Sequence, residues 1–492
     1  MESQTETHRK QKKWLRLLLF PLPFQGHVSP MLQLANLLYS KGFSITIIHT
    51  CFISSPKYPS KNPHFTFHSI PNGLSKSECS NADNLVSLVS LLNANCAEPF
   101  RDCLVKLLSY VSDEPVAGLI SDSTWKFTDS IAKSLQLPRF VLRTTNISSF
   151  LALAALPLLQ EKGYLPKQGS SLNSNQICHN HFSKSYLTTV FSPSESLEEK
   201  PVIELSPLKV KDIPVFKTQD QEGLHQTIAA LVEKTKSCTG VIWNSFEELE
   251  HGSLTDFLHN FPVPIFPIGP LHKYFPVPST SLLSQDQSAI SWLNKQAPKS
   301  VIYVSFGSVA SIEKSEFVEI AWGLANSEQP FLWVVRPGSV IGSEWLEPLP
   351  KGFMEEIKER GHIVKWAPQQ EVLAHTAVGG FWTHSGWNST LESICEGVPM
   401  ICHPCFGDQR VNARYVSDVW RIGVHLENKV DRFEIAKVVR KLLVEAEGHE
   451  IRDRILQFKK MANQSTQQQG SSYRSLESLV SLILSSQSQR KL

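Results

Sequence analysis

Short apolar runs alternate with longer amphipathic stretches along most of the chain. Residues 15–20 and 44–49 are apolar runs of strand length, and residues 30–39 between them carry leucines three and four positions apart. Apolar runs bounded by turn residues are typical of buried strands, whereas spacings of three and four are typical of helices. The pattern therefore predicts strand–helix–strand units, which favours an α/β fold with parallel sheets covered by helices.

The alternation continues through two similar halves, which fits two large domains in 492 residues. In the first half we predict further strands at residues 65–68, 116–121, 140–143 and 240–244, the last closing the sheet, and helices at 84–110 and 224–235. In the second half we predict strands at 301–304, 331–335, 362–366, 379–383 and 423–427, and helices at 288–294, 387–396, 411–419, 432–447, 451–461 and 473–483. The proline-rich residues 262–280 are typical of a linker between the halves.

Charge and hydropathy narrow the function classes. Lys plus Arg number 48 and Asp plus Glu 46, so the net charge is only +2, and nucleic acid is not indicated as a partner. A basic start followed by the apolar residues 15–20 could be taken for a secretory signal. However, Arg16 interrupts the apolar run and the stretch lacks a small-residue cleavage site, which favours a first strand. No segment approaches the roughly 20 apolar residues that a transmembrane helix needs.

The nine cysteines are odd in number and scattered, which is typical of a reduced, cytoplasmic protein. Cys402 and Cys405, with His403 between them, invite a metal or redox interpretation. No second pair lies at metal-ligand spacing, however, so we expect no metal site there.

Two side chains at strand ends are candidates for acid–base chemistry. His27 follows the first predicted strand and Asp122 ends the fourth. In a doubly wound sheet of strand order 3-2-1-4-5 these strands are neighbours, and their carboxyl ends flank the ligand-binding crevice. An imidazole whose Nδ1–H is held by a carboxylate presents a basic Nε2, as a hydroxyl-activating base requires. Alternatively, His27 is a solvated or capping loop residue and Asp122 caps the next helix.

The stretch from Trp366 to Gln409 predicts an anion-binding site. Its apolar strand, the turn at 384–386 and the helix at 387–396 present backbone N–H groups and the positive end of a helix dipole. One helical face carries polar side chains three or four positions apart: Ser385, Asn388, Ser389 and Glu392. The stretch has no Lys or Arg, which favours a diphosphate leaving group over phosphoryl transfer. Glu392, one turn after Asn388, could accept hydrogen bonds from two sugar hydroxyls, such as those of a ribose diol.

This stretch, with Trp-Ala-Pro-Gln-Gln at its start, His-Ser-Gly-Trp-Asn-Ser in the middle and Asp-Gln at its end, resembles the signature box of the plant secondary-product glycosyltransferases. The similarity covers nearly the whole chain and points to the subfamily with steviol glycoside and cytokinin glucosyltransferases. It implies the GT-B fold of two facing Rossmann-like domains. The implied parts are an acceptor-binding domain at 1–268, a linker at 269–287, a UDP-sugar-binding domain at 288–465, and a helix at 466–492 that packs back on the first domain.

The resemblance also implies roles for single residues, with His27 as the catalytic base and Asp122 as its partner. The implied donor contacts are Thr144 at the sugar; Ser308, His384, Asn388 and Ser389 at the diphosphate; Trp366 and Ala367 at uracil; Gln369 and Glu392 at the ribose; and Trp387, Asp408 and Gln409 at the hexose. In the family, Gln at the last of these positions goes with glucose. Without the resemblance, other interpretations stand: caps for Thr144 and Ser308, core aromatics for Trp366 and Trp387, a solvated residue for Glu392 and a turn former for Asp408.

The implied reaction is attack of an acceptor hydroxyl, carboxyl or nitrogen on UDP-glucose, with inversion to a β-glucoside. The sequence has no Asp-x-Asp pair to hold a divalent ion, so we expect an enzyme without a metal or cofactor. We expect a monomer whose partners are a UDP-sugar and a small apolar plant metabolite such as a terpenoid, flavonoid or hormone. Residues 167–202, rich in Ser, Asn, Lys and Glu, are predicted to be irregular and leave the acceptor open.

Two other functions remain possible from the sequence. A nucleotide-sugar-binding protein without catalysis would lack the base or its partner. A dinucleotide-dependent oxidoreductase would carry Gly-x-Gly-x-x-Gly after a first strand, where this chain has Phe-Gln-Gly-His27 and Phe-Gly-Ser308-Val instead.

Overall fold

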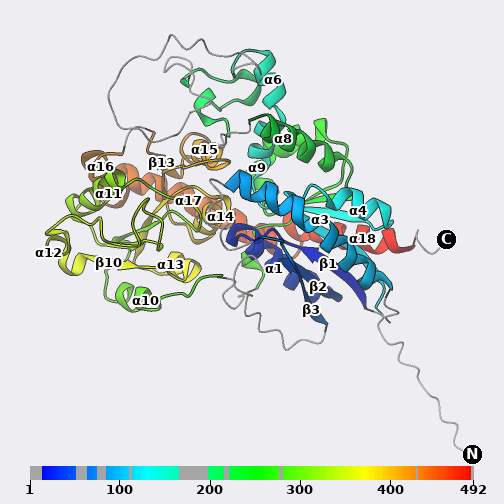
Figure 1. Cartoon of the computed structure of the whole chain (residues 1–492). Helices are drawn as coiled ribbons and strands as arrows, with labels where there is room; N and C mark the ends of the chain where they lie inside the picture. Colours follow the sequence, from blue (N-terminus) through cyan, green and yellow to red (C-terminus); the bar gives the residue numbers. More distant parts are fainter. Residues whose placement is uncertain are drawn as a thin grey trace, which may run out of the picture.

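The computed structural model describes residues 14–50, 64–74, 85–109, 114–165, 198–214, 221–275, 281–427 and 430–488. This part of the chain forms two halves, each built on a parallel sheet (Figure 1). The first sheet has the strand order β3-β2-β1-β4-β5-β6-β7 and the second β10-β9-β8-β11-β12-β13. Both orders are doubly wound, as the alternation of strands and helices predicts.

The strands of the first half are β1 (Leu15–Phe20), β2 (Phe43–Thr50), β3 (Phe65–Ile70), β4 (Val116–Asp122), β5 (Arg139–Arg143), β6 (Gly240–Trp243) and β7 (Ile265–Pro267). Its helices are α1 (Gln25–Ser40), α3 (Leu85–Ser109), α4 (Thr128–Ser134), α5 (Ile147–Ala154), α6 (Leu156–Glu161), α8 (Gln221–Lys236) and α9 (Glu247–Asn260). Short 3₁₀ turns lie at Ile203–Leu205, Val210–Asp212 and Leu271–Lys273.

The strands of the second half are β8 (Val301–Ser305), β9 (Phe331–Val334), β10 (Gly361–Val364), β11 (Val378–Thr383), β12 (Met400–Cys402) and β13 (Gly423–His425). Its helices are α10 (Ser288–Leu293), α11 (Lys314–Asn326), α12 (Phe353–Ile357), α13 (Gln369–Ala374), α14 (Trp387–Glu396), α15 (Gln409–Arg414), α16 (Arg432–Leu443), α17 (Ala446–Thr466) and α18 (Ser471–Ser488). A 3₁₀ turn lies at Lys358–Arg360 and a π turn at Tyr415–Val419.

Alternate residues of the central strands pack into different core clusters, because successive side chains of a strand point to opposite faces. In β1, Leu17 and Leu19 pack with residues of α1 and α18, whereas Leu18 and Phe20 pack with α3. In β8, the same alternation separates a cluster with α14 and α17 from one with α11 and α16. Each sheet is therefore covered on both faces, as predicted for near-continuous apolar strands.

The first sheet does not close at β6, as predicted, but at β7 inside the proline-rich stretch. Val241 N–H donates to the Pro264 carbonyl at 2.8 Å, and Ile268 N–H donates to the Trp243 carbonyl at 3.1 Å. An edge strand needs N–H donors on one side only, so it tolerates the prolines that suggested a linker. The predicted linker therefore begins too early at residue 262, and residues 276–280 of it lie outside the described part.

Other boundaries also differ. Helix α1 begins at Gln25 and not at residue 30, with Pro30 inside it. The helix predicted at 411–419 is split into α15 and a π turn, and α9 is not predicted at all. Of the predicted irregular loop, residues 167–197 lie outside the described part.

Helix α18 returns to the first half. Leu476, Leu479 and Ile483 are at most 1% exposed and belong to the same core cluster as Leu17 and Ile45. In Figure 1 this last helix, coloured red, lies beside the blue strands of the first sheet. The chain thus crosses between the halves twice, while the predicted domain limits stay predictions.

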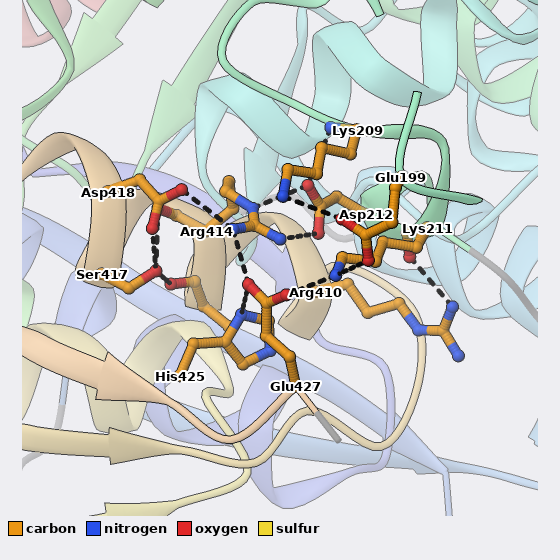
Figure 2. A network of polar contacts seen from close by, with 11 residues as sticks. Glu199, Lys209, Lys211, Asp212, Arg410, Arg414, Ser417, Asp418, His425 and Glu427 are labelled. Carbon is orange, nitrogen blue, oxygen red and sulfur yellow. Dashed lines mark hydrogen bonds and ion pairs between the residues drawn. The ribbon is translucent and has the colours of Figure 1, made fainter. Parts of the chain in front are cut away.

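A buried ionic cluster also joins the two halves (Figure 2). The Arg414 guanidinium donates to both oxygens of Asp212, from Nε at 2.8 Å and from Nη2 at 3.1 Å, and these side chains are each 2% exposed. Its Nη1 lies 2.9 Å from Asp418 and 2.7 Å from Glu427. Because Asp212 belongs to the first half and Arg414 ends α15, the cluster ties that helix to the opposite half.

Replacing Arg414 with Met should destabilise the protein by about 3–5 kcal/mol, because the buried Asp212 carboxylate loses its main partner. Thermal or denaturant unfolding measures the loss. As a control, Lys133→Met removes an ion pair to Asp129 in which the lysine is 61% exposed, and should change stability by about 0.5 kcal/mol or less. Equal effects of the two substitutions would contradict a structural role for the cluster.

Candidate active site

A cleft of about 500 Å³ opens between the carboxyl ends of the two sheets. The sequence places the predicted site residues after strands of both halves, and the fold turns those strand ends toward each other. Every predicted site residue except Asp122 lines the cleft: His27, Thr144, Ser308, Trp366, Ala367, Gln369, His384, Trp387, Asn388, Ser389, Glu392, Asp408 and Gln409.

His27 and Asp122 are in direct contact on the first-half side of this cleft. His27 Nδ1 lies 2.7 Å from Asp122 Oδ2 and 3.2 Å from Thr144 Oγ1. Asp122 is 1% exposed, and its Oδ1 accepts a hydrogen bond from the Thr124 N–H at 2.9 Å. Helix α4 begins only at Thr128, so Asp122 does not cap it. His27 lies in the first turn of α1 and not in a loop, and its Nε2 is the nitrogen left for a ligand in the cleft.

The charges around this pair favour its ionised form. Burial lowers the pKa of His27, but the carboxylates of Asp122 and, from the other half, Asp408 raise it above its ordinary value of 6.5. Burial opposes ionisation of Asp122, yet His27 and the Thr124 N–H hold its pKa below the ordinary value of 3.8. The site therefore stabilises an imidazolium, which is the product of a base that has taken up a proton.

A strained turn carries the chain from β11 into α14. Ser385 adopts a φ of +63°, in the left-handed region that costs a residue other than glycine about 1–3 kcal/mol. Its N–H donates to Thr383 Oγ1 at 3.2 Å and its carbonyl accepts from Asn412 Nδ2 at 2.8 Å, which hold this conformation. The turn brings the first residues of α14 to the wall of the cleft, and the first N–H groups of a helix have no acceptor within it.

His384 is enclosed by two glycines in this turn. A Cβ on Gly307 or Gly386 would lie 2.6 Å or 2.5 Å from the imidazole ring, so neither position accepts a side chain without a shift. Burial lowers the pKa of His384 to about 4, and the ring is neutral at pH 7. Ser308 follows Gly307 and does not cap a helix, because α11 begins at Lys314.

Glu392 is held by amides and is not a solvated helix residue. Gln369 Nε2 donates to Glu392 Oε2 at 2.7 Å and to Ser389 Oγ at 3.0 Å, and Gln370 Nε2 donates to Glu392 Oε1 at 2.9 Å. Burial raises the pKa of Glu392, and these two amides work against that shift. Gln370 is missing from the sequence-based prediction, although its position beside Gln369 could have suggested it.

Trp366 lines the cleft. Its Nε1 donates to Ser281 Oγ at 2.8 Å, and its ring packs half-buried against the core of the second half. Ala367 beside it is 3% exposed. The indole of Trp366 thus belongs both to the core and to the wall of the cleft.

Asp408 and Gln409 lie where α15 begins. Gln409 Oε1 accepts from the N–H groups of Cys405 at 2.8 Å and Phe406 at 3.0 Å, which leaves its NH₂ group as the donor toward the cleft. Burial raises the pKa of Asp408 to about 6. Asn412 Nδ2 donates to Asp408 Oδ2 at 3.2 Å and also to the Ser385 carbonyl, so this unpredicted amide connects the turn with α15.

The side chains of Trp387 and Asn388 contact the opposite half. Trp387 is 3% exposed, and its Nε1 donates to the Asn244 carbonyl at 2.7 Å. Asn388 Nδ2 donates to the Gly26 carbonyl at 2.8 Å, and its Oδ1 accepts from Asn244 Nδ2 at 3.3 Å. The ring of Trp387 is therefore a core aromatic, as the alternative interpretation states, and its indole N–H already donates to the Asn244 carbonyl. Sequence reasoning does not detect Asn244, which follows β6.

Among the described residues, no three His, Cys, Asp or Glu side chains are grouped so that they could hold a metal ion. Cys402 is buried, which raises the pKa of its thiol to about 12, and His403 Nε2 lies 3.0 Å from Glu316. No helix in the described part is long and apolar enough for a membrane span.

Comparisons with known proteins identify the family. Residues 254–450 match the family described as UDP-glucoronosyl and UDP-glucosyl transferase. UDP-glycosyltransferase 76B1 of Arabidopsis thaliana is 50% identical over 95% of this chain and 98% of its own length. UDP-glycosyltransferase 76G1 of Stevia rebaudiana is 46% identical over 99% of this chain and 100% of its own length. The chain belongs to the plant UDP-glycosyltransferase family.

Solved structures agree in fold. A UDP-glucose:anthocyanidin 3-O-glucosyltransferase in complex with UDP matches with a TM-score of 0.77 at 25% identity, over 96% of this chain and 100% of that one. A UDP-glucosyltransferase from Polygonum tinctorium matches with a TM-score of 0.75 at 27% identity, over 96% and 98%. These matches confirm the predicted GT-B fold, and membership of the family makes the protein an enzyme that transfers a sugar from a UDP-sugar to a small-molecule acceptor.

The raised pKa of His27 gives the enzyme a predictable pH dependence. If His27 is the base, as the sequence predicts, only its deprotonated imidazole accepts a proton, so kcat/KM should rise with pH through a pKa above 6.5. Asp122→Asn removes the charge that raises this pKa, so the rising limb should move to lower pH while kcat falls about 10²-fold or more. Asp129→Asn, which alters a carboxylate of the same half outside the cleft, is the control. An unmoved limb in Asp122→Asn would contradict the pairing.

Proposed function

We propose that this enzyme transfers glucose from UDP-glucose to a hydroxyl of a small, largely apolar acceptor, with inversion to a β-glucoside and without a metal ion. The observation that carries the proposal is the cleft itself. It presents the carboxylate-held imidazole of His27 on one wall and the N-terminus of α14 on the other.

In the proposed reaction, the acceptor oxygen attacks the anomeric carbon while the bond from that carbon to the diphosphate oxygen breaks. His27 Nε2 takes the hydroxyl proton, and Asp122 stabilises the resulting imidazolium. UDP leaves with the bonding electron pair. Because base and leaving group lie on opposite walls, attack comes from the face opposite the diphosphate, which supports inversion. Thr144 is proposed to contact the sugar, and its position 3.2 Å from His27 Nδ1 supports this.

The diphosphate is proposed to bind at the N–H groups that begin α14, with Ser308, His384, Ser389 and one N–H of Asn388. Neutral donors and a helix dipole stabilise an anion without Lys, Arg or a metal ion. His384 suits this role because it is neutral at pH 7 and its ring is fixed by its glycine neighbours.

The proposed nucleoside and hexose contacts come from residues that line the same cleft. Trp366 is proposed to stack on uracil beside the backbone of Ala367, and the amide-held Glu392, with Gln369, to accept the ribose hydroxyls. The hexose is proposed to meet the Asp408 carboxylate, the Gln409 amide and the backbone of Trp387. The Asp408 carboxylate accepts hydrogen bonds and the neighbouring Gln409 Nε2 donates them, so the two side chains suit adjacent hydroxyls of glucose.

The acceptor class is proposed from relatives. One relative, 42% identical, is a flavonol 3-O-glucosyltransferase of Arabidopsis thaliana. One similar solved structure is a UDP-glucose:anthocyanidin 3-O-glucosyltransferase in complex with UDP. We therefore propose a flavonoid, terpenoid or hormone-like acceptor with a hydroxyl, carboxyl or nitrogen nucleophile. The thiols of Cys96, Cys103, Cys238, Cys395 and Cys402 are free, which agrees with a proposed cytoplasmic location. We also propose that the enzyme acts as a monomer.

The test is an acceptor panel with UDP-glucose, read by mass spectrometry, with the anomeric configuration of the product determined by NMR. We expect a β-glucoside and unchanged rates after treatment with EDTA. His27→Ala should lower kcat by about 10²- to 10⁴-fold and keep the affinity for UDP. An α-linked product, or near wild-type turnover by His27→Ala on an aliphatic hydroxyl, would refute the mechanism.

Asp408→Asn and Gln409→Ala should each raise the KM for UDP-glucose about tenfold or more, because each loses a hydrogen bond to the hexose worth roughly 1.5 kcal/mol. The Kd of UDP alone should stay within about twofold, since UDP has no hexose. Calorimetric titration with UDP and steady-state kinetics with UDP-glucose separate the two effects. Equal losses of both affinities would show that these side chains do not contact the sugar.

A further inference from the structure

A proline interrupts the hydrogen bonding of the helix that carries His27. Pro30 is the sixth residue of α1, and a proline inside a helix has no N–H for the carbonyl four residues earlier. That carbonyl belongs to Gly26, the residue immediately before His27. The Gly26 carbonyl therefore lacks its usual donor in α1.

The other half of the molecule supplies the donor. Asn388 Nδ2, in the first turn of α14, donates to the Gly26 carbonyl at 2.8 Å. Asn388 Oδ1 accepts from Asn244 Nδ2 at 3.3 Å, and Asn244 Oδ1 accepts from the Leu271 N–H at 3.0 Å. A backbone N–H can only donate, so this chain of bonds fixes the oxygen and nitrogen of both amides. The amide of Asn388 is thereby held with its nitrogen toward α1.

We propose that Asn388 is a positioning residue for the catalytic base, acting on His27 through the Gly26 carbonyl. The carbonyl of Gly26 and the Cα of His27 belong to one planar peptide unit, and the atoms of such a unit move together. A bond that fixes the carbonyl therefore fixes the backbone from which the imidazole extends. The inference rests on the proposed role of His27 as the base.

A second contact from outside the first sheet supports the same turn. Gln25 Oε1 accepts from the Leu282 N–H at 2.6 Å, so the residues on either side of the Gln25–Gly26 peptide bond both bind distant segments.

The amide of Asn388 also has a second N–H, which is the one that can meet the diphosphate. One side chain then connects the leaving-group site with the base, and the distance between them is set by this contact.

The decisive variant leaves Asn388 intact. Pro30→Ala returns an N–H to α1, which draws the Gly26 carbonyl into the helix and away from Asn388. Alanine also has a helix propensity about 3 kcal/mol better than proline, so this variant should fold. Asn388→Ala removes the donor directly. Both variants should lower kcat at saturating substrates by about tenfold to 10²-fold, because small displacements of a base cost rates of this size.

The kinetic pKa identifies His27 as the residue affected. A displaced imidazole loses part of its contact with Asp122, so the rising limb of kcat/KM should move to lower pH in both variants, and Pro30→Ala should keep the wild-type Kd for UDP. Pro99→Ala removes a proline inside α3, and Asn36→Ala removes an amide of α1 whose Nδ2 bonds the Leu32 carbonyl of its own helix. Both controls should keep the wild-type kcat.

A wild-type kcat in either Pro30→Ala or Asn388→Ala, or a reduced kcat with an unmoved pH limb, would overturn the positioning role. Parallel assays of His27→Ala separate this outcome from failure of the proposed mechanism. If His27→Ala loses activity while Pro30→Ala does not, the base stands and the positioning role falls. If His27→Ala remains active, the base assignment itself is wrong.

Discussion

The chemistry proposed for this enzyme depends on a carboxylate-held imidazole on one sheet facing a helix N-terminus on another sheet. The imidazole belongs to the first half and the helix N-terminus to the second. His27 and Asp122 meet because β1 and β4 are neighbours in the first sheet, and the turn before α14 reaches the cleft because β11 lies beside β8 at the centre of the second sheet. Parallel strands gather their functional groups at one edge. The contacts that join the two edges therefore belong to the active site as much as the reacting groups do.

The described residues that line the cleft include no Lys or Arg. In the proposed complex, dipoles, hydroxyls and the neutral imidazole of His384 meet the diphosphate, while the carboxylates of Asp408 and Glu392 lie within the same cavity. Full opposite charges would bind UDP strongly before and after transfer, whereas dipoles favour the developing charge and still allow the product to leave. Dipoles can stabilise the developing charge in this way only if their side chains are fixed. A hydrogen-bonding group that had to reorient during the reaction would lose the benefit of preorganisation.

Most of the fold and the position of the cleft could be predicted from the sequence for a physical reason, whereas most of the single donor contacts came from the family resemblance. Buried parallel strands are continuous apolar runs, and the residues directly after them occupy the ligand edge, so His27, Asp122 and the turn at 384–386 are visible in the chain. The failures involve tertiary contacts. An edge strand between Pro264 and Pro267 depends on the β6 backbone, and Trp387 and Asn388 reach Asn244 and Gly26 across the cleft. Gln370 orients Glu392, which the fold brings near it, whereas Asn412 orients Asp408 from four positions along the start of α15.

The return of α18 to the first sheet has a consequence for biosynthesis. Leu476, Leu479 and Ile483 complete a core whose other members lie before residue 275. A ribosome adding about 5–20 residues per second reaches this helix some 10–40 s after the last strand of that sheet. During this interval the apolar face that α18 will cover is open to the cellular surroundings. The nascent first half should therefore be a substrate for chaperones until the final residues emerge.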